Sequence, residues 1–221
     1  MTVTRVPPRG STPSPTFFIV ADAGTPSAQF APWFALDFLS RFSASALGLA
    51  FAASYGIAAP VYRGYYLTAF PAAGYPADGA ADEMLSSLPV PLDETLLTVF
   101  IPSSASDGIP AGSDVVAYHD FSRVAPYLWV PWRPEGLASL SALDTFTWAL
   151  GHEWMEACTD TYPGMGTTFG GYEVGDLCED VYTTVAGSRG YTYLAQSFAG
   201  LDGSCWQPAA AAAVTLARAE P

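Results

Sequence analysis

The stretch LGHEWMEACTD, residues 150–160, decides the fold of this chain. Large apolar side chains recur on several sides of it, which predicts a helix that is buried around most of its circumference. His152 and Glu156 lie one helical turn apart, so both side chains leave the same face and are placed to hold one metal ion. Glu153 lies beside them. Buried carboxylates need partners, because an unpaired one in a protein interior is costly.

The same residues match the HExxH helix of zinc hydrolases with one change, since Glu156 stands where the second histidine would be. In that motif, the carboxylate at the position of Glu153 activates a water molecule bound to the metal. Residue chemistry alone leaves a second interpretation open. His152 and Glu156 would then pair with each other, or face a groove filled with solvent.

The expected helix has clear ends. Ser141 is placed to cap its N-terminus with Asp144 as the capping-box partner, and the helix has to stop before Pro163. Asp160 lies eight residues beyond His152, which is ~12 Å along a helix, so one ion cannot bind both. We therefore expect Asp160 to support the ligands or to form hydrogen bonds at the helix end.

Two motifs give a resemblance to a known family. The run HE-x-x-EA-x-TD, which starts at His152, is followed by EVGDLC at residues 173–178. Together they resemble a family of zincin-like proteins with HE-x-x-EA-x-TDP and E-[IV]-GD-x-C motifs, and the plant EXORDIUM-like (phosphate-induced) proteins look like distant relatives. The resemblance covers roughly residues 95–205. It matches residues 95–102 with the family's edge strand, and residues 117–120 with its YH-containing segment. Thr161 stands where the family has proline.

The resemblance implies a single zincin-like α+β domain with a mixed sheet, a buried active-site helix and a bound metal. The third ligand is expected from the downstream carboxylates, as in gluzincins, and Asp176 is favoured over Glu173. Zn²⁺ is the expected ion, although one imidazole with two carboxylates also suits Mn²⁺ or Ca²⁺. His119 is a candidate catalytic residue that would donate to a developing oxyanion or orient a ligand. The alternative for His119 is an ordinary strand histidine, satisfied by its neighbours.

Hydrophobic patterns predict the remaining elements. Because strands and helices occur in separate groups, they indicate an α+β fold rather than a doubly wound sheet. We expect residues 1–15 to form an extended Pro-rich arm, residues 16–207 the domain, and residues 208–221 an Ala-rich tail. Strands are expected at residues 16–22, 62–70, 95–102, 115–121 and 125–130, helices at 27–55 (one or two), 80–88 and 141–160, and a hairpin at 182–193.

Composition excludes several classes of function. The net charge of −13 repels nucleic acid and anionic membranes, so neither is an expected partner. No apolar stretch is long and unbroken enough for a membrane span, and residues 1–15 lack the apolar core of a secretory signal. Cys178 and Cys205 are candidates for a disulfide that pins a long loop, but their pairing stays open because the compartment is unknown.

The sequence therefore favours a metal-dependent, metallopeptidase-like hydrolase with Glu153 as the general base and a peptide or protein as substrate. The alternative is a structural or interaction protein, such as a virion or tail component, that keeps a zincin-like scaffold with the metal structural or absent. That alternative would bring homo-oligomers or a virion assembly partner. An extracellular or virion-associated location is favoured over the cytoplasm.

Overall fold

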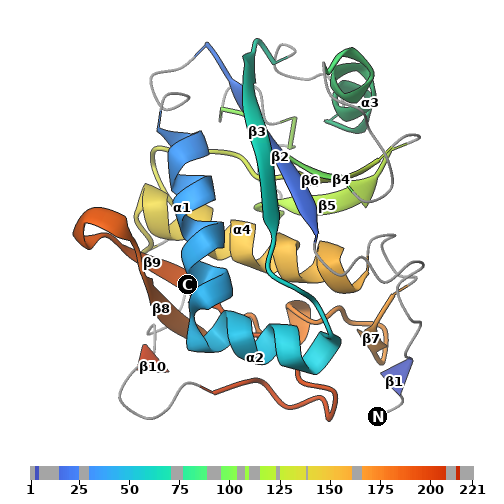
Figure 1. The fold of residues 1–221 in the computed structure, drawn as a ribbon, viewed down its shortest axis with the longest axis vertical. Helices are drawn as coiled ribbons and strands as arrows, with labels where there is room; N and C mark the ends of the chain where they lie inside the picture. The colour runs from blue at the N-terminus through green and yellow to red at the C-terminus, as the bar shows by residue number, and fades with distance from the viewer. Residues whose placement is uncertain are drawn as a thin grey trace.

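The computed structural model describes residues 3–4, 15–24, 30–70, 77–88, 96–103, 108–109, 115–122, 125–137, 139–160, 166–207 and 213–214. Over these residues, four α-helices pack with a five-stranded, a three-stranded and a two-stranded sheet (Figure 1). The expected α+β class with a mixed sheet is confirmed.

The five-stranded sheet has the order β3-β2-β4-β6-β5. Its strands are β2 (Thr16–Asp22), β3 (Val61–Thr68), β4 (Leu96–Ile101), β5 (Tyr118–Phe121) and β6 (Pro126–Trp129). Neighbours are parallel except for β5, which runs antiparallel to β6 at one edge.

The expectation that residues 95–102 form an edge strand is wrong. β4 lies between β2 and β6, and all six of its residues are buried. A strand that is paired on both sides and covered on both faces has a continuous apolar sequence, and LLTVFI is such a run. The described edges of this sheet are β3 and β5.

Helices and strands alternate in the N-terminal half instead of forming separate groups. The helices α1 (Ala31–Ala44) and α2 (Ala46–Tyr55) connect β2 to its parallel neighbour β3, and α3 (Ala77–Ser87) lies between β3 and β4 in the chain. Parallel strands need such crossover connections, which hydrophobic patterns alone did not reveal.

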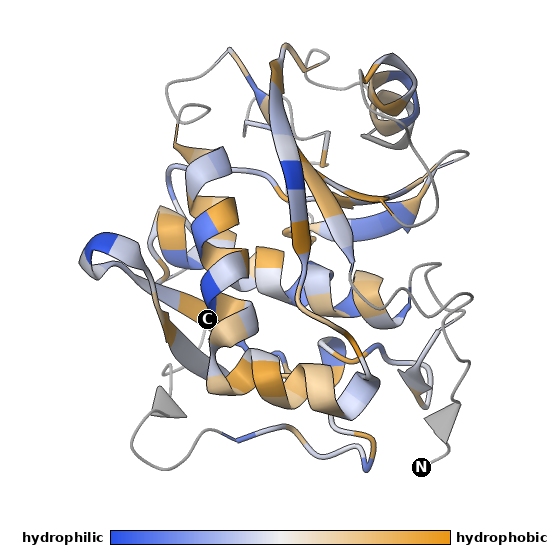
Figure 2. Ribbon diagram, viewed as in Figure 1, coloured by the Kyte–Doolittle hydropathy of each residue, from blue (hydrophilic) through white to orange (hydrophobic). Residues whose placement is uncertain are grey.

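The region expected as one helix or two forms two. Ser45 separates them, and its side chain accepts a hydrogen bond from the backbone N–H of Gly48, which caps α2. A Cβ on Gly48 would lie 2.0 Å from the backbone oxygen of Phe42, so only glycine allows this sharp bend. Figure 2 shows that α2 is hydrophobic along most of its length, and its residues Leu47 and Phe51 join the core.

Two hydrophobic cores fill the spaces on either side of the sheet. Alternate residues of β2 face opposite sides, as the strand period requires. Phe17 and Ile19 pack with α1 and α4, whereas Phe18 and Val20 pack with α3. The sheet therefore lies between α3 on one face and the other helices on the other (Figure 1).

Helix α4 (Ala142–Thr159) begins and ends as expected. Ser141 caps it, accepting from the backbone N–H of Asp144 and donating to its carboxylate. The helix lies between the large sheet and the hairpin of β8 (Tyr182–Ala186) and β9 (Thr192–Gln196) (Figure 1). Contacts on both sides explain why most of its residues are buried.

Short pieces complete the structure. The strand β1 (Val3–Thr4) pairs with β7 (Thr168–Phe169), and β10 (Ala213–Val214) pairs with β8. The rest of the expected arm and tail lies outside the described residues, apart from Pro15. The 3₁₀ helix η2 (Asp176–Cys178) ends at a disulfide, in which Cys178 is paired with Cys205.

No single helix in the described ranges has the length and apolarity needed to cross a membrane. In the same ranges, α1 and α2 taken together reach that length and composition, and they are bent by 69° where they meet.

Candidate metal centre

The polar residues expected to form a site come together at the C-terminal half of α4. Three elements supply them: the edge strand β5, the buried helix α4, and the segment that leads into η2. These residues are His119 on β5, His152, Glu153, Glu156 and Asp160 on or at the end of α4, and Glu173 and Asp176 before and in η2.

The first group joins His152, Glu156 and Asp176. Nε2 of His152 lies 3.1 Å from Oε2 of Glu156 and 3.7 Å from Oδ1 of Asp176. Two atoms that bind one zinc ion tetrahedrally at about 2.0–2.1 Å lie about 3.3–3.4 Å apart, so this spacing suits a shared ion. Asp176, the carboxylate expected as third ligand, is therefore the downstream carboxylate that lies close to His152.

The orientation of Glu156 is set by the backbone. Its Oε1 accepts hydrogen bonds from the N–H groups of Gly175 and Asp176, each at 3.2 Å, which leaves Oε2 to face the two imidazoles. Gly175 has ordinary helical dihedrals, so its role is not to turn the chain. A Cβ there would lie 2.8 Å from both Oε1 of Glu156 and Nδ1 of His152, so a larger residue would force the segment or these two side chains to shift.

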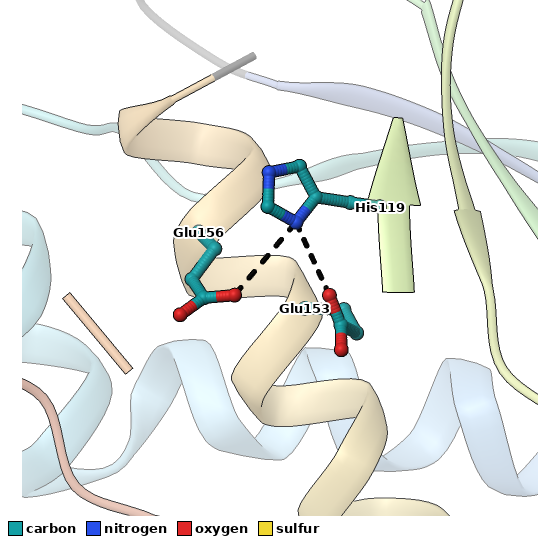
Figure 3. A group of neighbouring side chains, drawn as sticks. All are labelled: His119, Glu153 and Glu156. Atoms are coloured by element: carbon teal, nitrogen blue, oxygen red, sulfur yellow. Dashed lines mark hydrogen bonds and ion pairs between the residues drawn. The ribbon is translucent and has the colours of Figure 1, made fainter. Parts of the chain in front are cut away.

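The second group joins His119, Glu153 and Glu156 (Figure 3). Nδ1 of His119 lies 3.1 Å from Oε2 of Glu153 and 3.7 Å from Oε2 of Glu156. Nε2 of His119 lies 3.1 Å from the backbone oxygen of Asp160, which only accepts, so Nε2 carries a hydrogen. His119 thus faces α4 and does not rely on its neighbours in the strand.

Burial distinguishes the two groups. The side chains of His119, Glu153 and Glu156 are 4%, 7% and 3% exposed, whereas those of His152 and Asp176 are 16% and 45% exposed. Of the two groups, the one around His152 and Asp176 therefore opens to solvent. A site that binds both an ion and a substrate needs such an opening.

Electrostatics favour positive charge at both groups. Burial alone lowers the pKa of His152, but hydrogen bonds to Glu156 and Gln196 and the charges of Glu153 and Glu156 raise it to about 10. Burial also lowers the pKa of His119, yet its hydrogen bond with Glu153 and the surrounding carboxylates raise it to about 9. Among the described residues, these histidines are the ion-pair partners of the clustered glutamates.

Glu173 belongs to the His119 side. Its Oε1 lies 3.7 Å from Nε2 of His119, and it takes no part in the group around His152. Burial, opposed by the charge of His119 and reinforced by Glu156 and by a hydrogen bond with Asp160, raises the pKa of Glu173 to about 8.

Gln196 is a site residue that sequence reasoning missed. It is fully buried at the end of β9, and its Oε1 lies 3.1 Å from Nδ1 of His152. The two residues are 44 positions apart, and a single glutamine in a strand gives no local signal of such a contact.

Comparison of the chain with protein-family models, with curated proteins and with solved structures found no match.

Proposed function

We propose that this protein is a metal-dependent hydrolase of the zincin-like kind, with an ion held by His152, Glu156 and Asp176 and with Glu153 as general base. One observation carries the proposal. An imidazole nitrogen faces carboxylate oxygens from α4 and from η2 at the solvent-open end of a buried polar cluster. Negative groups that converge in this way need a positive charge among them.

Zinc is the ion that we propose, although the two carboxylates also suit manganese or calcium. When bound, the ion would lower the pKa of a water molecule and polarise a carbonyl group. The disulfide supports a secreted or otherwise oxidising location, because disulfides form and persist in such compartments.

Glu153 is assigned the proton transfers. In this role Glu153 would take a proton from a water molecule and deliver it to the leaving group. In the structure its Oε2 lies 3.1 Å from Nδ1 of His119. His119 holds Glu153 in place from β5, and the backbone oxygen of Asp160 holds His119 in turn. We assign a peptide bond as substrate by analogy with the HExxH hydrolases.

Metal analysis and a casein-hydrolysis assay on purified protein test the proposal. We expect one zinc ion per chain, which is lost in His152→Ala and kept in Glu153→Gln, and hydrolysis that is lost in both variants. If His152→Ala still binds zinc and His119→Ala does not, the ion would instead belong to the buried group of His119, Glu153 and Glu156.

The assay also separates the catalytic from the structural alternative. Stoichiometric zinc without any hydrolysis would favour an interaction protein that keeps the ion for stability. Hydrolysis that survives Glu153→Gln would remove Glu153 from the role of general base.

A further inference from the structure

Gln196 contacts both sides of the proposed metal site. Its Oε1 lies 3.1 Å from Nδ1 of His152 on α4, and its Nε2 donates to the backbone oxygen of Gly175 at 2.7 Å. It is 0% exposed, so no water competes for either contact. Gln196 thus connects the imidazole with the residue that precedes Asp176.

The orientation of the amide follows from chemistry. A backbone carbonyl oxygen only accepts, so the amide nitrogen of Gln196 has to face Gly175, and the amide oxygen has to face His152. Because an amide oxygen also only accepts, Nδ1 of His152 carries a hydrogen. In the neutral imidazole, Nε2 is then the bare nitrogen, and this is the atom that faces Glu156 and Asp176.

We propose that Gln196 is a positioning residue, which sets the tautomer of His152 so that Nε2 binds the ion and holds the segment of Asp176 against it. This inference rests on the proposed metal site. Outer partners of metal-binding histidines act in this way, by fixing the ring and raising its basicity.

The peptide units on either side of Gly175 make the positions of His152 and Asp176 depend on each other. The Gly175 N–H binds Oε1 of Glu156, and the Gly175 carbonyl oxygen binds Gln196, which binds His152. The backbone N–H of Ala199, three residues after Gln196, also donates to the oxygen of Val174 at 2.8 Å. Displacing Gln196 therefore disturbs the ring of His152 and the approach of Asp176 together.

The test compares two substitutions at the same helix–strand contact. Gln196→Met keeps the shape of the side chain and removes both hydrogen bonds. Thr147→Val is the matched control, because the buried Thr147 hydroxyl donates to the oxygen of Leu194 at 2.9 Å between the same α4 and β9. Zinc affinity is measured by competition with a chromophoric chelator, and folding is followed by thermal unfolding in EDTA.

We expect Gln196→Met to bind zinc about 10–100-fold more weakly, as for other outer partners of metal ligands. Thr147→Val should lower the unfolding temperature without changing zinc affinity. Gln196→Glu keeps the acceptor for Nδ1–H and loses the donor to Gly175, so its affinity should lie between those of Gln196→Met and the unchanged protein.

Nuclear magnetic resonance of ¹⁵N-histidine in the zinc-loaded protein gives a second readout. The Nδ1–H of His152 should exchange slowly in the unchanged protein and faster in Gln196→Met. Two results would overturn this inference alone. One is a zinc affinity of Gln196→Met equal to that of the unchanged protein, and the other is a loss of affinity in Thr147→Val as large as in Gln196→Met. An unchanged protein that takes up no zinc would overturn the proposed function and the inference with it.

Discussion

At the scale of single residues, the proposed site would set protons and a metal ion in competition for the same electron pairs. His152 takes up a proton readily in the metal-free protein, because its hydrogen bonds and the nearby carboxylates raise its pKa to about 10. A metal ion binds only the deprotonated nitrogen, so it has to displace that proton. The protonated imidazole and the metal complex are thus alternative ways to place positive charge beside Glu156 and Asp176.

This competition predicts how zinc binding depends on pH. Below pH 10 the imidazole of His152 is mostly protonated in the metal-free protein, so zinc affinity should rise with pH, by about tenfold per unit for one displaced proton. Chelator competition at pH 6, 7 and 8 measures this slope. An affinity that stays constant over the range would mean that His152 is not the ligand that loses the proton.

At the scale of elements, the site depends on how closely the segment before η2 approaches α4. Gly175→Ala would place a Cβ 2.8 Å from both Glu156 and His152, so the segment or these two side chains have to move apart. We expect weaker zinc binding, measured by the same competition. Gly200→Ala is the control in the same part of the chain, since its nearest neighbours, at 3.2 and 3.5 Å, leave more room. Equal affinities in the two variants would contradict the close approach.

The elements also show what the sequence was able to predict. Helix α4 was predictable because its cap, its apolar surface and the break after Asp160 are all local signals. The position of β4 in the sheet was not, because a run of apolar residues indicates burial without saying which strands lie beside it.

The same limit applies to the site. The helical spacing of His152 and Glu156 predicted that they share one face, which depends only on the period of the helix. The contacts of His119 with Glu153 and of Gln196 with His152 are 34 and 44 residues apart in the chain, and they depend on how strands pack against α4. Local patterns carry no information about such packing.

At the scale of the whole molecule, the disulfide ties the site to the C-terminal region. Cys178 lies two residues after Asp176, and Cys205 follows β9, which supplies Gln196. The bridge closes a loop over a sequence separation of 27 residues and so restricts the unfolded chain. It joins η2 to the segment after β9, the strand that packs against α4.

Replacing both cysteines, Cys178→Ser with Cys205→Ser, should therefore reduce stability and metal binding together. We expect a loss of about 2–4 kcal/mol in the free energy of unfolding, measured with denaturant in EDTA. Zinc affinity should also fall, because η2 is less well held. Cys158→Ser is the control, since Cys158 is a free thiol. Unchanged zinc affinity in the double variant would show that hydrogen bonds alone position Asp176.

The central claim is that one ion joins α4 to η2 at the open end of the cluster. A crystal structure of the zinc-loaded protein, with the anomalous signal recorded at the zinc edge, tests it most directly. We predict one peak bound by Nε2 of His152 and by carboxylate oxygens of Glu156 and Asp176, with Nδ1 of His152 still on Gln196. A peak between His119 and Glu153 with His152 unbound, or no peak at the cluster, would contradict the account.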